Sequence, residues 1–96
     1  MEIKHEEKDG KGLFYIENYY EKIAKLSYER TKEGNIVAKH TWVSPALEGQ
    51  GVAHKLFDKL VGLVRHDNAK LSSDCNYVKG KVEEKKENYA DIWTQK

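Results

Sequence analysis

Residues 43–53, which read VSPALEGQGVA, limit the possible folds of this 96-residue chain more than any other stretch. A β-rich run precedes them and a long amphipathic pattern follows, so a strand must pass into a helix here. Gly49 and Gly51 lie in the turn, and glycine adopts backbone angles that other residues rarely reach. Such a turn leaves successive N–H groups free to surround an anion at the start of a helix. A second interpretation is open, in which the glycines only relieve strain in an ordinary connection.

The first third of the chain has the patterns of antiparallel strands. Asp9-Gly10 lies between two runs, at residues 3–6 and 13–17, and this dipeptide is typical of a tight β-hairpin. Residues 24–29 alternate apolar with polar side chains, which is the period of a strand with one buried face. We therefore expect three strands before the turn at Gly34.

A fourth run, at residues 36–43, is predicted to be a central strand because both of its faces carry apolar side chains. Strict alternation places four residues on one face: Ile36, Ala38, His40 and Trp42. Pro45 has no N–H group and cannot continue an interior ladder, so the strand must end near Ser44.

The second half of the chain begins with a helical pattern. From Val52 the apolar residues recur at helical spacing to about His66 or Asp67, and Asn68 is a plausible left-handed stop. A short run at 70–74 follows, and a right-handed crossover would set it parallel to the strand at 36–43.

A second helix is predicted from Asn76, and residues 88–93 should return aromatic side chains to the core. The expected fold class is α+β, with four antiparallel strands, a crossover helix, a parallel fifth strand and a C-terminal helix. Residues 1–96 show no repeat and no linker, so we expect a single domain.

Composition excludes several classes of function. With 17 basic and 16 acidic residues the net charge is +1, without the basic excess of a nucleic-acid-binding protein. No apolar run approaches the roughly 20 residues that span a bilayer, and charged residues follow Met1. We expect a cytoplasmic protein without a nucleic-acid or membrane partner. It should be a monomer, since no heptad pattern or continuous apolar stripe remains outside the core.

Two residues are candidates for chemistry. Cys75, the only cysteine, lies between the predicted fifth strand and second helix, where the helix dipole favours a thiolate. His40 comes late in the neighbouring strand and could approach Cys75 as a base. Other interpretations are open, because a lone cysteine is commonly a small buried side chain and His40 could be a core histidine. His54 and His66 would be about 18 Å apart along one helix, so we expect no metal site.

The turn resembles a known family motif. Glu48-Gly49-Gln50-Gly51-Val52-Ala53 is similar to the acetyl-CoA-binding motif of the GNAT acetyltransferases, Gln/Arg-x-x-Gly-x-Gly/Ala, in its second half. Glu48 stands where that family usually has Arg or Gln. The whole chain looks like the short GNAT-like proteins, and the matching set is His40-Thr41-Trp42-Val43, Pro45, residues 49–53, Cys75, Tyr77-Val78 and Asn88-Tyr89-Ala90-Asp91. Two departures are Trp42, in place of an acidic residue, and Asn76, in place of a proline.

The resemblance implies a function and a set of site residues. Acetyl-CoA or CoA would be the ligand, and its binding residues would be Val43, Gly49, Gln50, Gly51, Val52, Ala53 and Tyr77. The protein would be an N-acetyltransferase of unknown amine acceptor, either through an acetyl thioester on Cys75 or by direct attack with His40 as base. The alternative is a non-catalytic module that binds acetyl-CoA, CoA or another protein.

Overall fold

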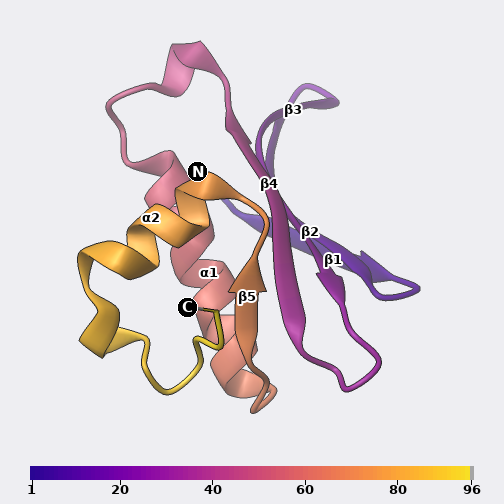
Figure 1. The fold of residues 1–96 in the computed structure, drawn as a ribbon. Coiled ribbons are helices and arrows are strands. Elements are labelled where there is room, and N and C mark those ends of the chain that lie inside the picture. Colours follow the sequence, from indigo (N-terminus) through magenta and orange to yellow (C-terminus); the bar gives the residue numbers. More distant parts are fainter. Residues whose placement is uncertain (96) are drawn as a thin grey trace.

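The computed structural model describes residues 1–95, which form one mixed sheet and two α-helices (Figure 1). The strands lie side by side in chain order: β1 Lys4–Lys8, β2 Lys11–Asn18, β3 Glu21–Arg30, β4 Ile36–Val43 and β5 Leu71–Ser73. The first four strands are antiparallel to their neighbours, whereas β5 runs parallel to β4. The predicted α+β fold and its order of elements are therefore confirmed.

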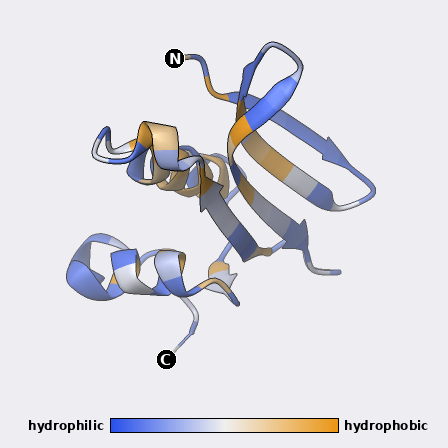
Figure 2. Ribbon diagram, turned by 90° about the horizontal axis from the view of Figure 1, so that it is seen from above, coloured by the Kyte–Doolittle hydropathy of each residue, from blue (hydrophilic) through white to orange (hydrophobic). Residues whose placement is uncertain are grey.

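Two α-helices cover the buried face of the sheet. The helix α1, Val52–His66, packs across β2, β3 and β4, and α2, Asn76–Glu84, lies beside β4 and β5. Short 3-10 turns occur at Pro45–Leu47 and Lys86–Asn88. Figure 2 shows hydrophobic residues gathered in α1 and in the strands beside it. Burial alternates along β2 and β3, so one face of the sheet supplies the core.

The turns show which local signals the sequence carries. Asp9 and Gly10 both have positive φ angles, 54° and 77°, as the predicted hairpin requires. Asn68, with φ 53°, is the predicted left-handed residue after α1. Tyr19 and Tyr20 also have positive φ, 51° and 73°, although neither is a residue type that favours this region.

The C-terminal segment closes the core as predicted. Leu71 of β5 donates its N–H to the carbonyl of Ile92 at 2.7 Å, and Thr94 returns a bond to the Leu71 carbonyl at 3.1 Å. The ring of Tyr89 meets Phe57 of α1 edge to face, with 5.4 Å between the ring centres. The outer edge of β5 is thus covered by the chain's own C-terminal segment.

A bulge in β4 changes the faces of its last residues. Ser27 of β3 pairs with His40, but the next residue, Tyr28, pairs with Ala38. Lys39 is therefore an extra residue in β4. A bulge of this kind moves every later side chain of the strand to the opposite face.

The predicted face of β4 is wrong beyond this bulge. Thr41 lies opposite the fully buried Leu26 and so faces the core. His40 and Trp42 face the other way and are exposed, with Trp42 46% accessible. Four residues were expected to share one face and do not: Ile36, Ala38, His40 and Trp42. The interpretation of His40 as a core histidine is therefore also wrong.

A polar network ties β1 and β3 to the end of α1. The Tyr28 hydroxyl is buried and donates to the Glu7 carboxylate at 2.6 Å. Its oxygen therefore accepts from Nε2 of His5, also 2.6 Å away. Arg30 contacts both oxygens of Glu7 at 3.1 Å and donates to Asp67 at 2.7 Å. The hydrogen bond from Tyr28 and the charge of Arg30 lower the pKa of Glu7.

This network predicts acid-sensitive stability. The pKa of Glu7 is lower in the folded chain than in the unfolded one, so its contribution is complete above the unfolded value, about 4.3. The contribution is lost as the pH falls through the folded value. Glu7→Gln should therefore cost about 1 to 2 kcal/mol at pH 7 and reduce the difference in melting temperature between pH 7 and pH 3.

Glu6→Gln is the matched control, since Glu6 is adjacent in β1 but exposed on the other face of the sheet. Thermal melts of the three proteins at a series of pH values make the measurement. An unchanged pH dependence in Glu7→Gln would contradict the network's role.

Candidate functional site

The strands β4 and β5 separate soon after they pair. Only residues 36–38 and 71–73 are in register, and the last link is the bond from the Asp74 N–H to the Ala38 carbonyl at 2.9 Å. Beyond it β4 continues to Val43, whereas β5 ends and the segment that follows it turns into α2. Ligands of open α/β sheets bind outside the carboxyl ends of their parallel strands. The space between these two elements is the corresponding place here.

The turn before α1 has the backbone geometry of an anion site. Gly49 and Gly51 have φ angles of 80° and 68°, in the left-handed region. A Cβ atom built on either glycine would meet no other atom within 4 Å, so the space beside each glycine is open. Gly51 caps α1 without any side-chain hydrogen bond. The N–H groups of the first helical turn have no partner within a helix, so they are available to a ligand.

A pocket of about 300 Å³ lies at this turn. Six of the seven predicted binding residues line it: Val43, Gly49, Gly51, Val52, Ala53 and Tyr77. The seventh, Gln50, is exposed and lies outside the lining. Glu48 also borders the pocket, as do residues that were not predicted: Leu47, His54 and Lys81.

Lys81 lines this pocket but was not predicted from the sequence. It lies one helical turn after Tyr77 on α2, and its Nζ is 5.8 Å from the centre of the Tyr77 ring. Burial raises the pKa of Tyr77. Residues four apart share a helix face, so the choice of Tyr77 could have led to Lys81. Lys81 supplies a cation at the rim of the pocket, where Glu48 supplies an anion.

A second pocket of about 520 Å³ surrounds Cys75. Cys75 is partly buried and caps the N-terminus of α2. Its Sγ lies 3.3 Å from Oγ1 of Thr41, which the bulge in β4 has turned to the inner face. The hydroxyl of Ser73 bonds both the N–H and the carbonyl of Cys75 at 2.8 Å, which holds its backbone in place. Tyr77 lines both pockets, so the two adjoin.

His40 lines the pocket of Cys75 but makes no hydrogen bond to its thiol. Among residues 1–95 no hydrogen bond joins the two side chains, and the partner of the thiol is Thr41. Lys39, the bulge residue, pairs with Asp74 across this pocket at 2.7 Å, and its hydrogen bond lowers the pKa of Asp74. The sequence analysis thus predicted that His40 and Cys75 lie near each other, and both line this pocket. It did not predict that Thr41 is the hydrogen-bond partner of the thiol.

Residues 1–95 hold no group of three or more His, Cys, Asp or Glu side chains arranged to bind a metal ion. Over the same residues, no helix has the length and apolar character needed to cross a membrane.

Comparison with known proteins agrees with the observed fold. The family model described as GCN5-related N-acetyl-transferase matches residues 13–92. The solution structure of a GCN5-like protein from Staphylococcus aureus is 32% identical, with a TM-score of 0.74, over 99% of this chain and 89% of that one. No curated protein matches the chain.

More distant structures share the fold. A ribosomal-protein-alanine N-acetyltransferase from Brucella melitensis biovar Abortus is 16% identical with a TM-score of 0.60, over 93% of this chain and 67% of that one. A GNAT-family protein from Desulfovibrio desulfuricans is 19% identical with a TM-score of 0.58, over 67% of this chain and 43% of that one. Because the family model matches most of the chain, the chain belongs to the GCN5-related N-acetyltransferase family.

Proposed function

We propose that this protein binds acetyl-CoA at the turn before α1 and transfers the acetyl group to an amine. The observation that supports this most is the turn itself, where Gly49 and Gly51 are left-handed and have no other atom within 4 Å of a built Cβ. A pyrophosphate needs several N–H donors and close approach to the backbone, and both are available here. The family relationship supports the same ligand. A single cysteine fits a reducing compartment, so we propose that the protein works in the cytoplasm.

The two adjoining pockets suit the two ends of the ligand. The pocket at the turn would take the pyrophosphate, with Val43 and Tyr77 beside the pantetheine arm that follows it. Tyr77 also borders the pocket of Cys75, so an arm that passes this ring would bring its thioester towards the thiol. Cys75 and Thr41 are the groups of this chain that would meet the acetyl carbon there.

Electrostatics at the rim is mixed. Lys81 lies on one side of the turn pocket and would attract phosphate. Glu48 is exposed on the other side and would repel it. Exposed charges interact weakly in water, so we expect Glu48 to weaken binding without abolishing it.

Titration of isotope-labelled protein with acetyl-CoA tests the site. We expect amide shifts at Gly49, Gly51, Ala53 and Tyr77 by millimolar ligand. Gly51→Val should abolish them, because a β-branched side chain disfavours φ 68° and fills the approach of the pyrophosphate. Gly34→Val is the matched control, since Gly34 has φ 86° and an equally open Cβ position in a remote turn.

The same titration measures the effect of Glu48. Glu48→Arg should tighten binding by about threefold to tenfold at low salt, and the gain should shrink as salt is added.

Absence of shifts at millimolar acetyl-CoA in the wild type would overturn the proposed ligand. Equal losses in Gly51→Val and Gly34→Val would mean that backbone strain, and not the site, explains the effect.

A further inference from the structure

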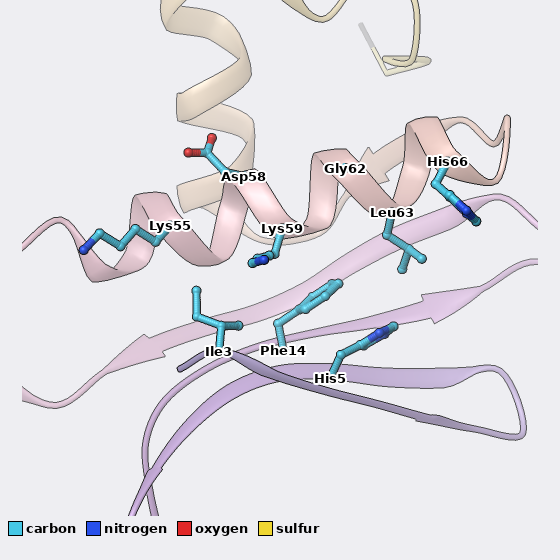
Figure 3. A pocket seen from close by; sticks show the side chains of 9 residues that line it. All are labelled: Ile3, His5, Phe14, Lys55, Asp58, Lys59, Gly62, Leu63 and His66. Carbon is cyan, nitrogen blue, oxygen red and sulfur yellow. The ribbon is translucent and has the colours of Figure 1, made fainter. Parts of the chain in front are cut away.

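A third pocket, of about 760 Å³, lies between α1 and the N-terminal strands (Figure 3). It is larger than the pockets at the turn and at Cys75, and it shares no lining residue with either. Its volume is within the range of about 300 to 1,000 Å³ that is usual for small-molecule sites. The pocket is therefore separate from the two pockets of the proposed acetyl-CoA site.

One side of the pocket is apolar. Ile3, which precedes β1, and Phe14 of β2 project towards α1, and Leu63 projects from α1 towards them (Figure 3). The ring of His5 stacks on Phe14, with 4.2 Å between ring centres, and its Nε2 is bonded to the buried Tyr28 hydroxyl. These contacts fix the ring of Phe14, which is only 4% exposed, so the partly buried Ile3 and Leu63 supply most of the accessible apolar surface.

The helix side of the pocket carries positive charge. Lys59 points from α1 towards the strands in Figure 3, and Lys55 lies one turn earlier. Neither lysine makes an ion pair within residues 1–95. Asp58, the acidic residue of the lining, points away from the strands, and its carboxylate lies 3.4 Å from Nε2 of His54. The pocket therefore offers an apolar wall beside two free cations.

Gly62 shapes the helix side of the pocket. It lies inside α1, where glycine is less favourable than alanine, yet a Cβ built there would meet no atom within 4 Å. The packing of this chain therefore does not require a glycine at this position. Gly62 lines the pocket, and its missing side chain leaves the helix surface open there.

We propose that this pocket binds a single-chain amphipathic carboxylate. The acyl chain would lie against Ile3, Phe14 and Leu63 and pass over Gly62, and the carboxylate would meet Lys59 and Lys55. The combination of an apolar wall, free lysines and an open helix surface fits this chemistry. A neutral or cationic amphiphile would leave the lysines without a partner.

Titration of the full chain with sodium octanoate, below the concentration at which it forms micelles, tests the proposal. Amide shifts are expected at Ile3, Phe14, Gly62 and Leu63, and the turn at 49–53 should stay unchanged. Acetate, which has no chain, and 1-octanol, which has no charge, should each bind at least about fivefold more weakly. Equal binding of 1-octanol and octanoate would overturn the role of the lysines.

Variants separate binding from stability. Gly62→Ala should weaken octanoate binding by about fivefold or more by filling the open helix surface, while it raises the melting temperature. Gly80→Ala is the control, because Gly80 is also helical with an open Cβ position but lies on α2 away from the pocket. Lys59→Gln should weaken binding by up to about fivefold, whereas the exposed loop variant Lys32→Gln should not.

Three results would overturn the proposal. One is equal octanoate affinity in wild type, Gly62→Ala and Gly80→Ala. Another is a set of shifts spread over the whole surface, which would indicate non-specific adsorption. The third is a solution mass of twice 11.1 kDa with the pocket protected from exchange, because a second copy of the chain would then cover it.

Discussion

Replacing Gly12 with alanine is expected to lower the free energy of unfolding by about 3 kcal/mol. A Cβ built at Gly12 would lie 2.0 Å from Cζ of Tyr28 and 2.3 Å from its hydroxyl oxygen, closer than real Cβ contacts approach. The ring cannot move aside easily, because it is buried and its hydroxyl is held by His5 and Glu7. Chemical denaturation of wild type and variant measures the difference.

The reason for the loss can be tested with a second change. In Tyr28→Leu the far end of the ring is gone, so adding Gly12→Ala to it should cost less than adding it to wild type. Gly80→Ala is the control and should raise the free energy of unfolding, since its Cβ would meet no other atom and alanine favours the helix. Additive losses in the Gly12→Ala/Tyr28→Leu pair would show that the contact with the ring is not the cause.

The contact at Gly12 illustrates what the sequence could not predict. Gly12 follows the Asp9-Gly10 turn, and nothing local distinguishes it from another turn glycine. Its role depends on Tyr28 in the next strand, and the network extends from there through Arg30 to the end of α1. Local signals, such as the Asp-Gly pair and the helical period from Val52, were sufficient to predict the elements. Contacts between elements were not local and were not predicted.

For the same reason, the residues that line the pocket at the turn were predicted only in part. The glycine turn is a contiguous motif, and six of seven residues chosen from it and its neighbourhood line one pocket. The bulge at Lys39 is an offset between two strands, and β4 alone does not reveal it. Without the bulge, alternation places His40 towards the core and Thr41 away from it. The structure shows the opposite, which is why Thr41 was missed.

The hairpin between β2 and β3 is a different case. Its turn residues, Tyr19 and Tyr20, are left-handed and almost fully exposed, with 88% and 102% of their surface accessible. Such turns usually contain glycine or asparagine at these positions, so turn chemistry gave no signal. The pairing of the long strands β2 and β3 up to Asn18 and Glu21 holds the two tyrosines in this unfavourable conformation.

Cys75 decides whether the protein acts through a covalent intermediate, and the difference should be all or none. We expect acetyl-CoA to leave one acetyl group on wild-type protein and none on Cys75→Ala. The thiolate would attack the acetyl carbonyl, the bond from that carbon to the CoA sulfur would break, and CoA would leave as a thiolate. An acceptor amine would then attack the new thioester, release Cys75 and lose its extra proton to water.

Thr41 is the residue that would position the thiolate of Cys75 in the covalent route. Oγ1 of Thr41 lies 3.3 Å from the sulfur, where a hydroxyl can donate to a thiolate, and Cys75 itself caps the N-terminus of α2. Thr41→Val should therefore slow formation of the adduct by about tenfold to a hundredfold, since a charge-assisted hydrogen bond contributes about 1.5 to 3 kcal/mol. Thr41→Ser keeps the hydroxyl and should react nearly as fast as wild type.

Mass spectrometry of the intact protein, with CoA release measured over a panel of amines, separates the three possible outcomes. An adduct that vanishes in Cys75→Ala, together with slow labelling of Thr41→Val, supports the covalent route. Turnover that survives Cys75→Ala but not His40→Ala would instead support direct attack by the amine, with His40 reaching the site from the exposed face of β4. Binding of acetyl-CoA without an adduct or CoA release would identify a non-catalytic binder, because the proposed binding pocket at Gly49 and Gly51 does not include Cys75.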